Sequence, residues 1–94
     1  MSGIRKVGIL GSGIMGAGLA EVAARAGFDV VVRSRSKAAA EAMVTTIDKS
    51  FLKAIERGKA TDDERAAVLG RIHATDHLGA VADCDLVIES VVED

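Results

Sequence analysis

Three glycines follow a short apolar run near the start of the chain, in a spacing that suits the binding of a diphosphate. The run covers residues 7–10, and the glycines are Gly11, Gly13 and Gly16. Between a strand and a helix, the first glycine allows a tight turn, the second lets the backbone approach a pyrophosphate, and the third lets the helix pack closely on the strand. The free N–H groups at the helix start then face the phosphates. We therefore predict a dinucleotide-binding turn made of Gly11, Ser12, Gly13, Ile14, Met15 and Gly16. The alternative is a glycine-rich turn without a ligand.

A second set of candidate ligands follows the next apolar run. In dinucleotide folds that prefer NAD, an acidic residue about 20 positions past the glycines holds the ribose 2′-hydroxyl. Here the stretch reads Arg33-Ser34-Arg35, and it contains no carboxylate. A guanidinium matches phosphate geometry through two hydrogen bonds. We predict that Arg33, Ser34 and Arg35 contact the 2′-phosphate of NADP, or serve NADP and NAD alike. The alternative is that both arginines are solvated loop charges and that Ser36 only caps the next helix.

Other residue types give weaker signals. His73 and His77 are four residues apart, but the segment reads as a strand followed by a cap, so we expect no metal site. Cys84 is the single cysteine, which excludes a disulfide framework, and we expect it to be a small buried residue. Met15 either covers the cofactor or packs in the core.

The composition limits the classes of partner that the chain is expected to bind. The 94 residues carry a net charge of −2, and the only aromatic residues are Phe28 and Phe51. The chain has neither the excess of basic residues nor the aromatic stacking platform that would favour a nucleic-acid partner. It also contains no run of 18 apolar residues that would indicate a membrane span. We expect a cytoplasmic protein that binds neither nucleic acid nor membrane.

The elements that must position these residues can be read from periodicity and turn signals. Short apolar runs predict strands over 6–10, 29–33, 72–75 and 85–89. Helical spacing predicts a helix over 14–26, with Met15, Leu19, Val22 and Ala26 as apolar positions. A long helix over 37–57 follows, with Ala42, Ile47, Phe51 and Ile55 on one face, and a capping box from Thr61 to Glu64 opens a helix that ends at Gly70. Asp76 is predicted to cap a helical turn through residue 81.

Strands that alternate with helices indicate a parallel sheet with right-handed crossovers. We expect one α/β unit over residues 1–94, a Rossmann-like, doubly wound parallel sheet in the incomplete order 3-2-1-4, with a helical pair inserted after strand two. The fourth strand would be an exposed apolar edge, so we expect poor solubility or self-association into a dimer or larger homo-oligomer.

The whole chain resembles the N-terminal part of the 3-hydroxyacyl-CoA dehydrogenase family, especially bacterial 3-hydroxybutyryl-CoA dehydrogenases. Three stretches carry the resemblance: the glycine region over 7–20, the helical insertion that ends Glu56-Arg57-Gly58-Lys59, and the Val-Ile-Glu-Ser-Val-Val-Glu ending over 87–93. The first stretch alone would also fit 3-hydroxyisobutyrate and 6-phosphogluconate dehydrogenases. The family usually has Asp where this chain has Ser34, so the resemblance implies NAD and this residue argues for NADP.

The resemblance also implies roles for residues outside the glycine turn. Val91, Val92 and Glu93 would line the nicotinamide-side ribose, and Ser50 and Arg57 would contact the acyl-CoA substrate. The alternatives are an ordinary exposed acid for Glu93 and a solvated helix face for Ser50 and Arg57.

The reaction implied by the family is the reversible oxidation of an (S)-3-hydroxyacyl-CoA to the 3-ketoacyl-CoA. Its general acid/base lies in a His-Phe-Phe-Asn-Pro-like stretch that these 94 residues do not contain, so no residue of the chain is expected to be catalytic. We expect the chain to be a cofactor-binding portion, without the substrate domain and inactive alone. Two other classes stay open: a stand-alone nucleotide-binding module that senses redox state, and a non-catalytic nucleotide-binding fragment.

Overall fold

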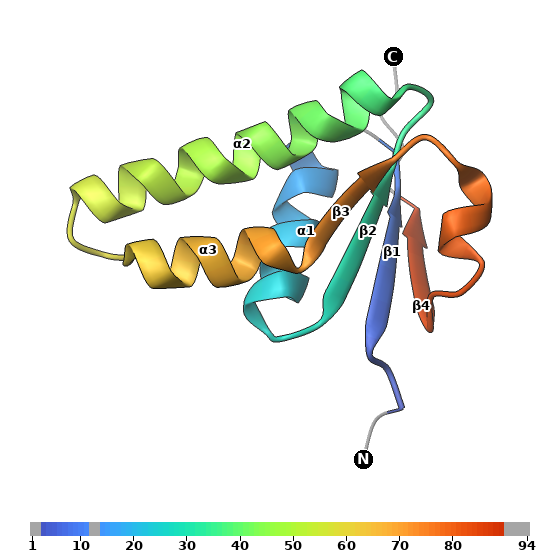
Figure 1. Ribbon diagram of the computed structural model, residues 1–94, viewed down its shortest axis with the longest axis horizontal. Helices are drawn as coiled ribbons and strands as arrows, with labels where there is room; N and C mark the ends of the chain where they lie inside the picture. The colour runs from blue at the N-terminus through green and yellow to red at the C-terminus, as the bar shows by residue number, and fades with distance from the viewer. Residues whose placement is uncertain (1–2, 12–13, 90–94) are drawn as a thin grey trace.

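The computed structural model describes residues 3–11 and 14–89, which form a four-stranded sheet flanked by helices (Figure 1). The strands are β1 (Lys6–Leu10), β2 (Asp29–Arg33), β3 (Ile72–Thr75) and β4 (Leu86–Glu89). They lie in the order β3-β2-β1-β4, and every neighbouring pair runs parallel. The predicted order 3-2-1-4 and the Rossmann-like α/β class are confirmed.

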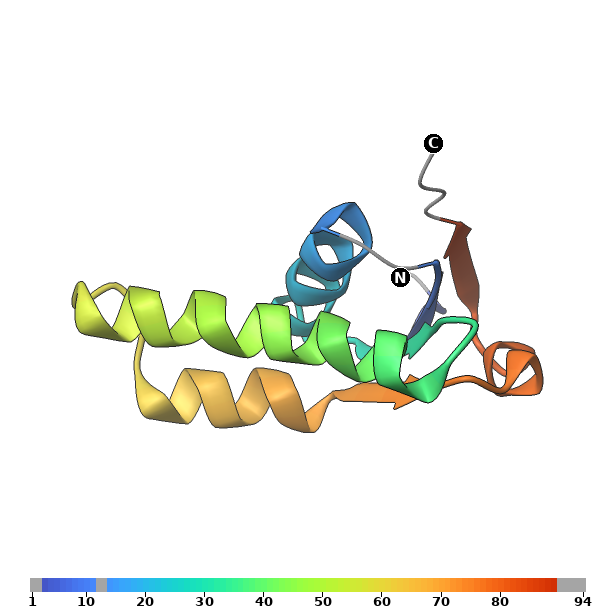
Figure 2. The same ribbon diagram turned by 90° about the horizontal axis from the view of Figure 1, so that it is seen from above.

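Three α-helices and one 3-10 helix connect these strands. They are α1 (Ile14–Arg25), α2 (Lys37–Glu56), α3 (Asp62–Gly70) and η1 (Leu78–Val81). Seen from above, α2 and α3 run alongside each other and extend well beyond the sheet (Figure 2). The ion pair between Asp48 of α2 and Arg65 of α3 joins them. This is the helical pair that the sequence predicts after strand two.

Polar side chains fix the starts of the two inserted helices. Ser36 is the N-cap of α2, and its Oγ accepts a hydrogen bond from the Ala39 N–H at 3.1 Å. Thr61 and Glu64 exchange hydrogen bonds of 3.2 Å at the start of α3. These side chains satisfy N–H groups that a helix start otherwise leaves without partners. Both caps confirm what the sequence predicts.

The main core lies between the sheet and the faces of α1 and α2. Alternate residues of a strand point to opposite faces, and the central strands bury valine and isoleucine toward the helices. The buried residues of this core are Val7, Ile9, Val30, Val32 and Ile72 from the strands, Ala17, Ala20 and Ala24 from α1, Ala40, Met43, Ile47 and Phe51 from α2, and Val68 from α3.

The predicted inner face of α1 is correct at Leu19, which packs against the core, and wrong at Met15, Val22 and Ala26, which are exposed. Met15 and Val22 are 74% and 67% exposed, whereas Ala20 and Ala24 are fully buried. The helix packs on the sheet through its smallest side chains, because alanines let the helix axis approach the strands closely. A similar correction applies to Ala42 of α2, which is exposed while Ala40 and Met43 are buried.

The opposite face of the sheet is covered around Gly8 by η1 and the turn that follows it. A Cβ built on Gly8 would lie 3.1 Å from the Cys84 Sγ and 3.2 Å from the Val81 Cγ1, so a glycine is needed for this close approach. Cys84 is half-buried here, and burial raises the pKa of its thiol. It therefore packs on the face of the sheet away from α1 and α2.

Two predicted boundaries change at this end of the chain. Asp76 does not cap the turn: η1 begins after His77, and the N-cap position has no side-chain hydrogen bond. Strand β4 begins at Leu86, one residue later than predicted, and the Asp85 carboxylate instead accepts hydrogen bonds from the N–H groups of Arg5 and Lys6 at 2.8 and 3.1 Å.

Candidate functional site

The turn after β1 has the geometry that the glycine spacing predicts. Gly11 has a φ of +120°, a backbone conformation that favours glycine over any residue with a side chain. Its N–H donates a 3.0 Å hydrogen bond to the Arg33 carbonyl, so the start of the turn is fixed to the end of β2. Helix α1 then begins at Ile14 without an acidic residue in its first turn, which leaves its N-terminus favourable for an anion. Ser12 and Gly13 lie outside the described residues.

The two residues after Ile14 face in different directions. Gly16 is buried in α1, consistent with the close helix–sheet packing expected of the third glycine. Met15 is 74% exposed, so it does not pack in the core formed by the described residues. Its thioether is therefore available at the same end of the sheet as the turn.

The end of β2 lies directly beside this turn, because β2 is the neighbour of β1. Ser34 is buried, at 5% exposure, and its N–H donates to the Thr75 carbonyl at 3.2 Å. Arg33 is half-buried, and its Nε donates to the Asp76 carbonyl at 3.1 Å. Arg35 is exposed and makes no hydrogen bond or ion pair with another described residue. The structure thus gathers Gly11, Arg33 and Ser34 at one edge and leaves Arg35 on its rim.

The end of β3 belongs to the same edge, which sequence reasoning did not include. Thr75 pairs in register with Arg33, so Asp76 and His77 follow at the level of Ser34 and Arg35. Both are exposed, and the His77 Nε2 lies 3.5 Å from the Asp76 Oδ1. The predicted sheet order was sufficient to place them here, because parallel strands end at a common edge.

The remaining predicted ligands are not gathered at this edge. Ser50 and Arg57 are exposed, Ser50 within α2 and Arg57 at its C-cap. At about 1.5 Å per residue, Ser50 lies roughly 20 Å along the helix from its start, and Arg57 lies about 30 Å along it. Both therefore lie on the projecting helical pair (Figure 1). Val91, Val92 and Glu93 lie outside the described residues.

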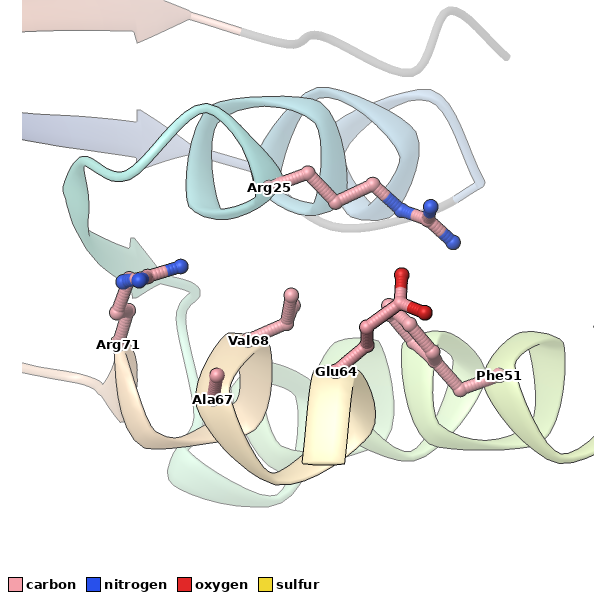
Figure 3. A pocket seen from close by; sticks show the side chains of 6 residues that line it. All are labelled: Arg25, Phe51, Glu64, Ala67, Val68 and Arg71. Carbon is pink, nitrogen blue, oxygen red and sulfur yellow. The ribbon is translucent and has the colours of Figure 1, made fainter. Parts of the chain in front are cut away.

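A pocket of about 270 Å³ lies between α1 and α3, at the opposite end of α1 from the glycine turn. Figure 3 shows the long side chains of Arg25 and Glu64 reaching toward each other across it. The Arg25 guanidinium lies 4.4 Å from the centre of the Phe51 ring and pairs with Glu21, and the Arg71 Nη1 donates to the Ala24 carbonyl at 2.8 Å. These contacts already engage both arginines, Arg25 between α1 and α2 and Arg71 between α1 and the C-cap of α3, so we interpret the pocket as a packing feature.

Other kinds of site find no support in the described ranges 3–11 and 14–89. There, no three His, Cys, Asp or Glu side chains come together in a way that could hold a metal ion. None of the helices described is both long enough and apolar enough to cross a bilayer.

Comparison with known proteins assigns the chain to a family. The family model described as "3-hydroxyacyl-CoA dehydrogenase, NAD binding domain" matches residues 6–94. The chain belongs to this family. The predicted resemblance is therefore confirmed, and the matched region is the NAD-binding domain of this family.

Individual relatives and solved structures are similar to the chain in sequence and in fold. A probable 3-hydroxybutyryl-CoA dehydrogenase of Deinococcus radiodurans is 49% identical over 88 residues, which are 94% of this chain and 31% of the relative. The crystal structure of FadB2 from M. tuberculosis superposes with a TM-score of 0.92 at 44% identity, covering 99% of this chain and 33% of that one. The (S)-3-hydroxybutyryl-CoA dehydrogenase PaaH1 from Ralstonia eutropha gives 0.91 at 36% identity, covering 97% and 32%. The chain thus spans about a third of the length of these relatives.

Proposed function

We propose that the chain supplies the cofactor-binding part of an oxidoreductase that interconverts (S)-3-hydroxyacyl-CoA and 3-ketoacyl-CoA. The substrate we favour is 3-hydroxybutyryl-CoA, the substrate in the names of most of the closely similar relatives. The observation that carries the proposal is the glycine turn at the edge where β1 and β2 end, within the family match over 6–94. A bound nicotinamide cofactor would supply the hydride acceptor or donor.

The chain's own residues fit a dinucleotide at this edge. Gly11 adopts the left-handed conformation of a phosphate turn, and the first turn of α1 carries no acid that would repel a diphosphate. The family assignment supports NAD. We extend it to NADP, because Ser34 puts no negative charge near the ribose 2′-position and Arg35 is free to meet a phosphate there.

The other roles implied by the resemblance stay predictions. They are acyl-CoA contacts for Ser50 and Arg57 and ribose contacts for Val91, Val92 and Glu93. The expectations drawn from composition and from the sheet edge also stay predictions: a homo-oligomeric assembly, a cytoplasmic location and the absence of nucleic-acid and membrane partners. A non-catalytic nucleotide-binding module is the second candidate function, because the glycine turn would serve such a module equally well.

A chimaera tests the proposed function directly. Residues 1–94 would replace the matching N-terminal third of the Deinococcus radiodurans relative, with which they share 49% identity. We expect the chimaera to oxidise (S)-3-hydroxybutyryl-CoA with NAD or NADP, because the transplanted part would bind the cofactor and the relative would supply the rest. The measurement is the absorbance of the reduced nicotinamide formed.

The matched control is the same chimaera with Gly11→Val, which puts a branched side chain where φ is +120°. This variant should lose cofactor binding and turnover together. A folded chimaera that binds the cofactor in a calorimetric titration but shows no turnover would contradict the enzyme proposal and leave the binding module. A folded chimaera that binds neither cofactor would contradict both.

A further inference from the structure

We infer that the two arginines at the end of β2 have different tasks: Arg35 is the specificity-determining residue that binds the 2′-phosphate, and Arg33 is a positioning residue that fixes the neighbouring strand end. The inference rests on the proposed binding of NADP. It goes beyond that proposal by separating two residues that sequence reasoning treats as equivalent.

The direction of the Arg33 side chain carries the first half of the inference. Strand β2 lies between β1, which bears the glycine turn, and β3. The Arg33 Nε donates to the carbonyl of Asp76, directly after β3, at 3.1 Å. The guanidinium is therefore turned toward the β3 side of β2, away from the turn where the diphosphate would bind.

Neighbouring hydrogen bonds make this contact part of a larger connection between the two strand ends. The Ser34 N–H donates to the Thr75 carbonyl at 3.2 Å, and the His77 N–H donates to the Thr75 Oγ1 at 3.1 Å. Arg33 thus extends the β2–β3 pairing by one more bond beyond the last paired residues, Arg33 and Thr75. Its task is to hold residues 76 and 77 at the edge where the adenosine end of either cofactor would lie.

The situation of Arg35 carries the second half. It lies between the buried Ser34 and the helix cap Ser36, whose hydrogen bond to Ala39 fixes the start of α2. The backbone on both sides is therefore held, whereas the Arg35 side chain is exposed and bonded to no described residue. Its N–H donors remain available for bidentate contact with a phosphate, and α2 carries no acid in its first turn to compete for them.

The two tasks predict different changes in affinity, which calorimetric titration with NADPH and NADH can measure. Arg35→Ala should weaken NADPH binding by about 10- to 150-fold, the range expected for a lost charged hydrogen bond, and leave NADH binding unchanged. Arg33→Ala should weaken both cofactors to a similar extent. Arg33→Gln keeps an amide donor for the Asp76 carbonyl without the charge, and it should restore both affinities.

Salt dependence and a distant arginine supply the controls. Added salt should weaken NADPH binding more in the unsubstituted protein than in Arg35→Ala, because a charged contact at an exposed position is screened. Arg5→Ala removes the same side chain before the start of β1, at the opposite edge of the sheet, and should change neither affinity. Circular dichroism verifies that each variant is folded, and Arg33→Gln decides the role of Arg33 if Arg33→Ala does not fold.

The possible results distinguish a failure of this inference from a failure of the proposed function. If NADPH binds but Arg35→Ala leaves the ratio of the two affinities unchanged, the inference is wrong and the proposed function stands. If Arg33→Gln weakens NADPH alone, both arginines bind the phosphate and the division of tasks is wrong. If the unsubstituted protein binds NADH and not NADPH, the extension to NADP fails, and the inference fails with it.

Discussion

At the scale of single residues, Ser34 occupies the position from which a carboxylate would select NAD in a dinucleotide fold. Its neutral side chain is 5% exposed, and its backbone is tied to Thr75. A carboxylate there would accept hydrogen bonds from the ribose and repel a 2′-phosphate. The serine does neither strongly, so, if the proposed binding of NADP holds, we expect the charge of the exposed Arg35 to govern the choice between the cofactors.

Restoring the carboxylate and removing the charge should reverse this choice. We expect Ser34→Asp combined with Arg35→Ala to bind NADH more tightly than NADPH in a calorimetric titration. The matched control is Ser34→Ala with Arg35→Ala, which should lose NADPH affinity without gaining NADH affinity. The new carboxylate is buried, so the double variant should also melt at a lower temperature than its control. An unmoved preference would mean that neither residue faces the ribose.

The sequence was enough to predict which residues meet at this edge, but not to distinguish the surroundings of Arg33 from those of Arg35. Gly11 and Ser34 are recognisable locally, because each follows a short apolar run at a known place in the fold. The difference between Arg33 and Arg35 depends on which strand borders β2 on each side and on the Asp76 carbonyl, so it needs the tertiary structure. Met15 shows the same limit, since periodicity alone could not tell a core residue from one left exposed beside the turn.

At the scale of elements, Asp85 ties the start of β1 to the start of β4. Its carboxylate accepts hydrogen bonds from the Arg5 and Lys6 N–H groups, and its own N–H donates to the Lys6 carbonyl at 2.9 Å. The hydrogen bonds from the Arg5 and Lys6 backbone lower the pKa of the Asp85 carboxyl below its ordinary value of 3.8. The ionised form is therefore the one that the fold stabilises.

This lowered pKa makes stability depend on pH in the acid range. A group whose pKa is lower in the folded state stabilises the fold above its ordinary value, and that contribution is lost as the pH falls through the folded-state value. We expect the free energy of unfolding to decrease below about pH 4, and Asp85→Asn to reduce that decrease in urea titrations made at several pH values. Asp83→Asn removes the same charge two residues away without these backbone hydrogen bonds, and it should retain the full decrease.

The elements themselves were well predicted where the signals are local. Val30, Val31 and Val32 mark a buried strand, and the Thr61–Glu64 box marks a helix start, and both occur as predicted. The errors involve partners distant in sequence: the Asp85 carboxylate accepts hydrogen bonds from the N–H groups of Arg5 and Lys6, about 80 residues earlier in the chain. The exposed face of α1 was misassigned for a related reason, since burial follows the shape of the packed sheet as well as hydrophobicity.

At the scale of the whole molecule, the described residues end in an uncovered sheet edge. Strand β4 has β1 as a neighbour on one side and no described strand on the other. Its neighbouring residues Leu86 and Val87 are 43% and 42% exposed. An apolar edge with unpaired backbone groups is a template for pairing with another chain.

We therefore expect the purified 94-residue chain to self-associate through β4. Sedimentation velocity at increasing concentration should show dimers or larger species, and Val87→Lys should shift the distribution toward monomer, because a charge on an edge strand opposes pairing. Val22→Lys is the matched control: Val22 is 67% exposed on α1, so a charge there should leave association through the edge intact. An unsubstituted chain that stays monomeric at high concentration would contradict the prediction. Loss of association in Val22→Lys but not in Val87→Lys would place the contact on α1 instead.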